Sequence, residues 1–190
     1  MFPHTVKSNL PLLIFVLILT ACDYATSTSD KKILDFEYFT ITVPKNWNKI
    51  KAKGQDSYVG RILIDGLDTL EFDLGWYSND LSEFKKIKKE NGRVYYGNVA
   101  DTSNSLKLLD SIEMEKAKKC ISTWQKIDGH LTKFVTPLIS GVGMTGIYID
   151  SLWMAGSDHD RFNLFGTNLK PENEQAFLSA IKTLKFTKNK

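Results

Sequence analysis

Cysteine and histidine are the scarcest reactive residues of this sequence, whose 190 residues include two cysteines and three histidines. A zinc site takes three or four such ligands at short spacings, and no spacing of that kind occurs here. The cysteines, Cys22 and Cys120, are the only pair that could form a disulfide, and Cys22 has another expected role described below. The sequence therefore predicts a domain without a cofactor, a metal centre or an internal disulfide.

Neither sign of charge dominates the sequence, which has 25 basic and 22 acidic residues and a net charge of +3. This balance does not indicate a nucleic-acid partner, which requires a concentrated basic footprint. Long hydrophobic runs are also scarce, and the clearest one covers Leu12–Leu19. Its apolar surroundings, Leu10–Ala21, fall short of the roughly 20 residues of a transmembrane helix. With Lys7 before it, the run is typical of a secretory signal peptide.

The end of this run, Leu19-Thr20-Ala21-Cys22, resembles the lipobox of bacterial lipoproteins. The resemblance implies cleavage before Cys22, a diacylglycerol on its thiol, and a fatty acyl chain such as palmitate on the new amino terminus. It also implies a location in the bacterial cell envelope, with the domain outside the cytoplasm and a membrane as its first partner. The alternatives are an ordinary signal peptide and an uncleaved anchor.

The sequence is expected to have three parts. Residues 1–21 form the signal peptide, and residues 22–32, which are polar and rich in serine and threonine, form a flexible tether. Residues 33–190 form one domain, because no repeat or linker divides them and their length suffices for one core.

Alternating apolar and polar residues predict several strands. Phe39–Val43 alternates strictly and stops at Pro44. Tyr58–Ile64 and Leu67–Trp76 are expected to form a hairpin with a tight primed turn at Asp65-Gly66. Further expected strands are Arg93–Val99, Ile121–Ile127 and His130–Val135 around Asp128-Gly129, Ile147–Met154, and Arg161–Gly166 after a turn at Ala155–Asp160. The buried face of the second strand is expected to carry Leu70, Phe72, Leu74 and Trp76.

Two helices are predicted, and one segment suits either structure. Asp80–Glu90 has a capping residue, an apolar stripe and a terminal Asn91-Gly92. A second helix is expected to start at Pro171. Asn104–Lys119 fits a helix or a strand, and we favour the helix. Together these elements predict an α+β fold, an antiparallel β-sheet with flanking helices. The expected buried stripe of the second helix is Phe177, Ala180, Ile181 and Leu184.

The two ends of the domain carry a family resemblance. Phe39–Trp47, with the sequence FTITVPKNW, and a final helix followed by Leu184-Lys185-Phe186 resemble the Mog1/PsbP-like α/β/α sandwich. The resemblance implies a protein that binds or helps to assemble other proteins, although a fold does not fix a function.

The segment Gly141–Gly146 matches the G-x-G-x-x-G pattern of dinucleotide-binding proteins. That site needs a helix after the glycines, whereas Ile147–Asp150 predicts a strand, so no nucleotide is expected. We expect the loop Pro137–Gly146, with its glycines Gly141, Gly143 and Gly146, to be mobile and to contact a protein partner.

Other polar and aromatic residues are weaker candidates. Ser157–Asp160 contains a histidine between carboxylates, but a polar turn explains it. The acidic run from Asp65 to Asp73 is expected to be a solvated sheet face paired with cations such as Arg61. Cys120 is expected to be a small buried side chain. The four tryptophans, Trp47, Trp76, Trp124 and Trp153, are expected in the core, and Tyr77, Tyr95, Tyr96 and Tyr148 on a recognition surface.

The sequence thus favours a non-enzymatic, lipid-anchored binding or assembly module of the cell envelope with an unidentified protein partner. The alternative is an envelope hydrolase with an unrecognised site near residues 137–160. Lysines 85, 86, 88 and 89 are expected to form a solvated face, with a lipid head-group contact as the other reading.

Overall fold

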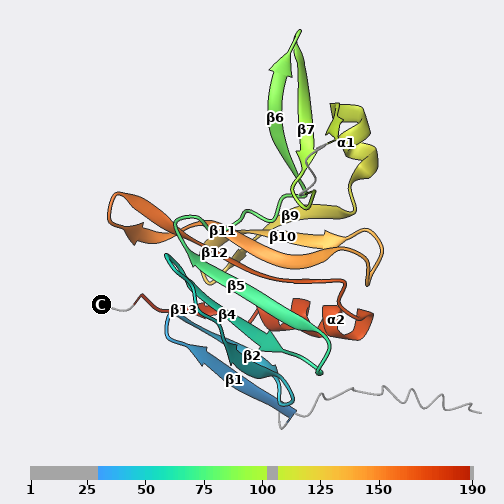
Figure 1. Ribbon diagram of the computed structural model, residues 1–190. Helices are drawn as coiled ribbons and strands as arrows, with labels where there is room; N and C mark the ends of the chain where they lie inside the picture. Colours follow the sequence, from blue (N-terminus) through green and yellow to red (C-terminus); the bar gives the residue numbers. More distant parts are fainter. Residues whose placement is uncertain (1–29, 102–106, 189–190) are drawn as a thin grey trace, which may run out of the picture.

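The computed structural model describes residues 30–101 and 107–188. Its body is a seven-stranded antiparallel sheet in the order β3-β4-β5-β12-β11-β10-β9 (Figure 1). The fold is mostly antiparallel β-sheet with two helices, so it is richer in strand than the expected α+β class. The strands of this sheet are β3 (Asn48–Lys51), β4 (Tyr58–Leu63), β5 (Thr69–Gly75), β9 (Cys120–Ile127), β10 (His130–Pro137), β11 (Met144–Ala155) and β12 (Asp158–Thr167).

The inner face of the sheet packs against a helix and a smaller sheet. The helix is α2 (Pro171–Ile181), and the smaller sheet has the order β1-β2-β13, with β1 (Lys31–Phe36), β2 (Phe39–Pro44) and β13 (Lys185–Phe186). Both lie below the large sheet in Figure 1. Successive side chains of a strand point to opposite faces, and one apolar set of the central strands points to this side. The cross-strand pairing aligns Phe72, Leu164, Ile147 and Phe134 across four neighbouring strands, and all four side chains are buried in the core.

The strand and the helix predicted near the two ends of the domain are confirmed. In β2, Phe39, Ile41 and Val43 are buried, and Trp47 packs into the same core. Helix α2 begins at Pro171. The described sheet starts at Lys31, two residues inside the segment expected to be a tether. The predicted apolar stripe of the last helical segment, Phe177, Ala180, Ile181 and Leu184, is buried as expected.

The two turn signals have different outcomes. Asp128 and Gly129 both have positive φ, and Ile127 pairs with His130, so the predicted tight primed turn is confirmed. At Asp65-Gly66 the prediction of a tight turn is wrong, because residues 64–68 lie between the paired ends of β4 and β5. The Asp65 carboxylate instead accepts hydrogen bonds from Lys170 and Asn173 and from two turn amides, which lowers the pKa of that carboxyl.

The predicted helix over Asp80–Glu90 is wrong. Residues Phe84–Glu90 form strand β6, which pairs with β7 (Arg93–Asn98). Asn91 and Gly92 both have positive φ and close this hairpin, so they do not end a helix. The register shifts between Lys86 and Lys88. This bulge is why the apolar residues of the segment are three apart, a spacing that also suits a helix.

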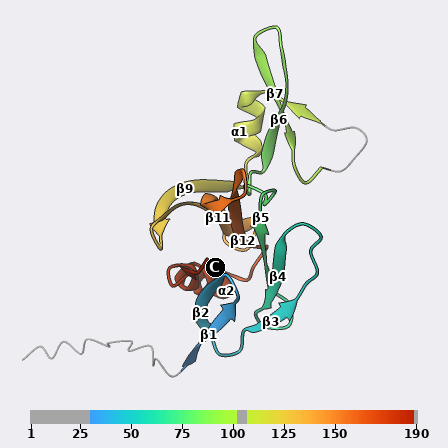
Figure 2. The same cartoon turned by 90° about the vertical axis from the view of Figure 1, so that its left-hand side faces the viewer.

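The hairpin belongs to an arm, which we define as the described part of residues 76–119. The arm also contains β8 (Leu108–Leu109) and α1 (Ser111–Ala117), and it stands out from the body on the side opposite α2 (Figures 1 and 2). The ambiguous segment Asn104–Lys119 therefore holds both a short strand and a helix, and its first residues, 104–106, lie outside the described residues. Helix α1 has a capping box formed by Asp110 and Glu113.

The tryptophans are mostly not core residues, contrary to expectation. Trp47 is 1% exposed, but Trp76 is 36% exposed because β5 ends one residue earlier, at Gly75. Trp153 is partly buried beside the core, and Trp124 is exposed on β9. Placing Trp76 on the buried face of β5 was wrong for this reason, whereas Leu70, Phe72 and Leu74 are buried as predicted.

Candidate functional site

The outer face of the seven-stranded sheet, opposite α2, carries several hollows, including one of about 500 Å³ lined by residues of the arm, β9 and β10. Where the arm joins the body there is a cavity of about 340 Å³, which we call the arm cavity. Its volume lies at the lower end of the range that small ligands or partner side chains occupy. Its apolar lining comes from Leu81 and Val99 on the arm side and from Val142, Met144 and Phe165 on the body.

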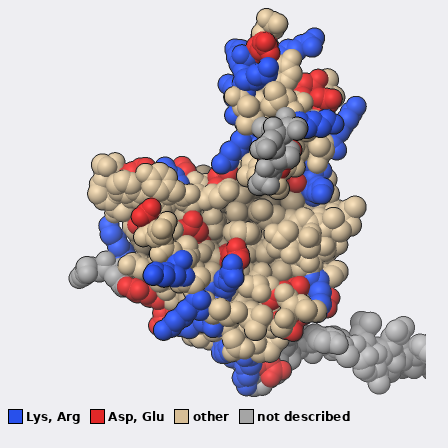
Figure 3. Space-filling model, in the orientation of Figure 1, with Lys and Arg blue, Asp and Glu red and all other residues tan. Residues whose placement is uncertain are grey.

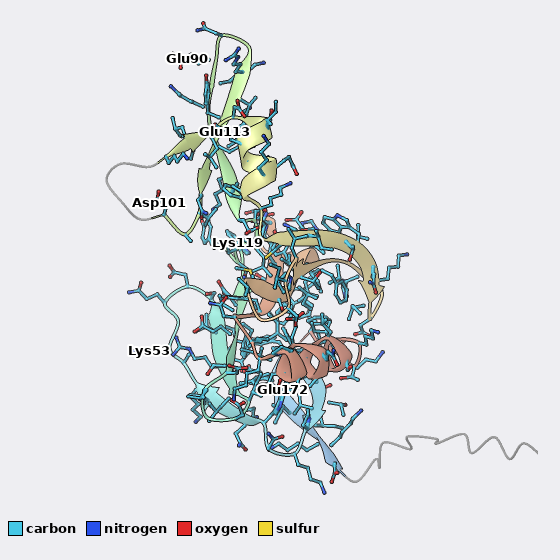
Figure 4. All side chains as sticks on the ribbon, turned by 90° about the vertical axis from the view of Figure 1, so that its right-hand side faces the viewer. Lys53, Glu90, Asp101, Glu113, Lys119 and Glu172 are labelled. Carbon is cyan, nitrogen blue, oxygen red and sulfur yellow. The ribbon has the colours of Figure 1, made fainter. Side chains whose placement is uncertain are left out.

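Polar contacts hold the arm in place beside this cavity. The Glu83 carboxylate accepts hydrogen bonds from the backbone N–H groups of Lys119 and Cys120, at 2.9–3.1 Å. The Lys133 ammonium group donates to the backbone oxygen of Asp80 at 2.9 Å. Lys119 lies at the junction of the two parts in Figure 4. The arm therefore meets the body through charge-assisted bonds that leave the apolar lining free.

Cys120 lies in the wall of the arm cavity, as a small buried side chain. Its Sγ is 3.5 Å from the backbone oxygen of Met144. Burial raises the pKa of this thiol, so the protein favours the neutral form and not a nucleophilic thiolate. Among the residues that the structure places around the cavity, none is a histidine that could act as a base.

A second hollow, of about 390 Å³, adjoins the arm cavity through the shared side chains Asn79 and Phe165. We call it the acidic hollow after Glu71 and Asp73, although Lys53 and Arg61 also line it. Glu71 forms a salt bridge of 2.8 Å with Arg61, its directly opposite neighbour on β4, as the sequence analysis expected.

Asp73 is the unusual group of the acidic hollow. Its Oδ1 atom is buried and has no hydrogen-bond partner among the described residues. The neighbouring Asn163 already has a partner at each polar atom of its side chain, because its oxygen accepts from the Asp73 N–H and its amide nitrogen donates to the Asn79 oxygen. A buried carboxylate oxygen without a partner is costly, so this position favours a ligand that brings a donor. We call the two joined hollows the sheet groove.

The sheet groove was not predicted from the sequence, with the exception of one glycine at its edge. Gly143 lines the arm cavity, whereas Gly141 does not and Gly146 is a buried residue within β11. Gly146 packs against β12, where a Cβ would lie 2.5 Å from the Cβ of Phe165. The strand expected after the glycine pattern is β11.

The glycine loop is shorter and better anchored than expected, since only residues 138–143 lie between β10 and β11. The buried Glu174 accepts hydrogen bonds from the Ser140 hydroxyl at 3.0 Å and from the Gly141 N–H at 3.1 Å. Gly143 donates to the side-chain oxygen of Asn168 at 2.8 Å. These hydrogen bonds offset the entropic cost of ordering the glycines. The sequence alone did not indicate such bonds.

We expect Glu174→Ala to speed amide hydrogen exchange at Gly141 by roughly 10- to 150-fold, because a hydrogen bond to a charged group contributes about 1.5–3 kcal/mol. Exchange followed by NMR or mass spectrometry on residues 138–143 measures this. Glu172→Ala, an exposed position on the same helix (Figure 4), is the control and should leave the loop unchanged. Equal exchange in both variants would contradict the anchoring role.

The tyrosines predicted to share one recognition surface differ in their exposure to solvent. Tyr77 is 83% exposed, as a recognition residue requires. Tyr148 is buried, and its hydroxyl donates to Asp150 at 2.6 Å, so its place on that surface was wrong. Burial and the nearby carboxylate raise the pKa of Tyr148. Tyr95 and Tyr96 lie half-buried on the arm.

The residues proposed for a hydrolase alternative have structural partners. Asp160 accepts a hydrogen bond from the Trp153 indole at 2.9 Å. Asp158 accepts from the N–H of His159 and from Arg161. These contacts give no specific support to catalysis near residues 137–160. In residues 30–101 and 107–188, no three His, Cys, Asp or Glu side chains are grouped so that they could hold a metal ion.

No protein-family model, curated protein or solved structure matches this chain. Cys22 and the signal segment lie outside the described residues. Within those residues, neither helix combines the length and hydrophobicity that a bilayer crossing demands.

Proposed function

We propose that this chain is a lipid-anchored, non-enzymatic binding or assembly module of the bacterial cell envelope, tethered through Cys22. In this proposal the sheet groove holds a segment of a partner protein outside the cytoplasm. The observation that carries the proposal is the arm cavity, an apolar hollow that the arm and the body form together. A cavity of this kind binds by excluding water from apolar groups.

The lining of the sheet groove favours a partner segment of a particular chemistry. An apolar side chain would fill the space between Leu81 and Phe165. A cationic or amide donor close to it in the partner would be attracted to the carboxylates of Glu71 and Asp73. Because the two hollows share Asn79 and Phe165, these positions are neighbours in the sheet groove. The expected ligand is therefore an extended peptide segment with an apolar residue near a lysine or arginine.

The Mog1/PsbP-like resemblance remains part of the proposal. It is supported by the meeting of the two chain ends that carry it, because β13 pairs with β2 through Lys185 with Thr40 and Phe186 with Phe39. In the same region Trp47 packs into the core with residues of α2. A binding or assembly role agrees with that resemblance.

Filling the arm cavity is expected to abolish partner capture. Ala100 lines this cavity and is exposed, so Ala100→Trp should occupy the apolar space without removing a core side chain. A photoreactive residue at Val142, half-exposed in the lining, reports occupancy in the native envelope. We expect one discrete crosslinked protein with the otherwise unchanged chain, and at least a tenfold weaker band with Ala100→Trp.

The matched control is Ala117→Trp, an exposed alanine of α1 outside the lining of both hollows. This variant should crosslink normally from position 142. A photoreactive residue at Ile33, exposed on β1, controls for random collision. The proposed site is wrong if the crosslink survives Ala100→Trp or appears equally from position 33.

A further inference from the structure

The hairpin β6–β7 at the end of the arm has a strongly biased charge. Residues Phe84–Asn98 contain five basic side chains and one carboxylate, a larger positive excess than the net +3 of the whole sequence. The remaining residues are therefore close to balance. Figure 3 shows blue atoms over much of the arm, together with some red ones, and both colours over the body. The basic residues are Lys85, Lys86, Lys88, Lys89 and Arg93.

These basic side chains are exposed to solvent, and few of them have an acidic partner among the described residues. All five are exposed in the described structure. Lys88 forms a salt bridge of 2.7 Å with Glu90, the one acidic residue of the hairpin, and its ammonium lies 5.3 Å from the centre of the Tyr95 ring. Glu90 lies at the far end of the arm in Figure 4. Four positive charges on one strand repel each other, and a negatively charged ligand would relieve this repulsion.

The residue between the two lysine pairs indicates which class of negatively charged ligand fits the hairpin. Ile87 is 50% exposed at the bulge of β6, between Lys86 and Lys88. An apolar side chain surrounded by ammonium groups matches the boundary between phosphate head groups and acyl chains. Single-stranded nucleic acid would favour open aromatic platforms, whereas Tyr95 and Tyr96 are half-buried and Lys88 covers one ring. An anionic lipid surface is therefore the better match.

We propose that hairpin β6–β7 is a membrane contact that binds the phosphate groups of anionic phospholipids and inserts Ile87 at the interface. This contact is independent of the sheet groove and of the lipid anchor. The described chain begins with β1, at the end of the molecule opposite the hairpin (Figures 1 and 2). A chain anchored before β1 would therefore contact a membrane at two separate points. Each lysine close to an anionic surface adds to the attraction, which salt screens.

The test uses the full chain in lipid nanodiscs with a polarity-sensitive dye on Ile87→Cys. Cys120 is buried and its pKa is raised, so it should not take the dye, and intact mass verifies one dye per chain. We expect a blue-shifted emission in nanodiscs with one quarter anionic phospholipid, but not in purely zwitterionic ones. About 0.5 M salt should abolish the shift, since the Debye length then falls well below 10 Å.

Two variants with equal charge changes make the test specific. Replacing Lys85, Lys86, Lys88 and Lys89 by glutamine should remove the blue shift without changing the melting temperature. Replacing Lys31, Lys45, Lys51 and Lys53 by glutamine, all exposed on the body, should leave it intact. The proposal is overturned if emission is equal in both lipids or if the variants behave alike. A shift with soluble polyphosphate or single-stranded DNA but not with anionic nanodiscs would assign the hairpin to a soluble polyanion, and would also overturn it.

Discussion

Replacing Trp47 by alanine is expected to lower the free energy of unfolding by about 3–5 kcal/mol, the usual cost of deleting a large buried aromatic side chain. Trp47 is 1% exposed and is the largest of the fully buried side chains of the core. It belongs to the core cluster that contains residues of the small sheet, the large sheet and α2, so alanine would leave a cavity in that core. Urea denaturation followed by far-ultraviolet circular dichroism measures the loss.

Trp76→Ala is the matched control for this prediction. Trp76 is 36% exposed, and its ring lies over Gly156 at the turn between β11 and β12. Because about a third of that side chain keeps its contact with water, its removal should cost less than the removal of Trp47. A loss at Trp76 that equals the loss at Trp47 would mean that the core is placed wrongly.

The contrast between these tryptophans shows what the sequence could predict. Within β2 and β5, strict alternation predicts the buried face, and Phe39, Phe72 and their neighbours obey it. Alternation does not indicate where a strand stops. Strand β5 ends at Gly75. Trp76 is the first residue of the arm, so it does not continue the alternation of β5. The error at Trp76 was therefore one of element boundary and not of strand phase.

The arm shows a conflict between two local signals. Leu81, Phe84 and Ile87 repeat at helical spacing, while Asn91-Gly92 is a strong hairpin signal. The structure follows the turn, because pairing with β7 provides backbone partners for β6, and a bulge at Ile87 absorbs the irregular spacing. The choice between these signals depends on pairing with β7. The residues of β7 lie outside the segment 80–90, so that segment alone cannot decide it.

The sheet groove could not be predicted from the sequence because its walls come from distant parts of the chain. Leu81 and Val99 belong to the arm, and Phe165 belongs to β12. In β12, alternation assigns Phe165 to the outer face, which is the local sign that this face is not purely polar. A large aromatic side chain on the outer face of a central strand needs a cover, and the inserted arm provides part of it.

Cys22→Ala is expected to abolish acylation and to release the mature domain from the membrane. The lipobox resemblance makes the thiol of Cys22 the point of lipid attachment, so alanine leaves no atom for the thioether. Two acyl chains hold a protein on a membrane for long periods, because each buried CH₂ contributes about 0.8 kcal/mol and a second chain adds on the order of 10 kcal/mol. A purely electrostatic contact by the arm should not survive high salt in this variant.

Intact-mass measurement and membrane fractionation in 1 M salt test this expectation, with Cys120→Ala as the matched control. Cys120 is buried in the wall of the arm cavity, so its replacement should leave the acyl adduct and the membrane location unchanged. The wild-type chain should carry a diacylglycerol adduct at Cys22 and remain with the membranes, whereas Cys22→Ala should lose both properties. A wild-type chain without that adduct would refute the anchor. Membrane binding that survives 1 M salt in Cys22→Ala would show that another part of the chain holds it there.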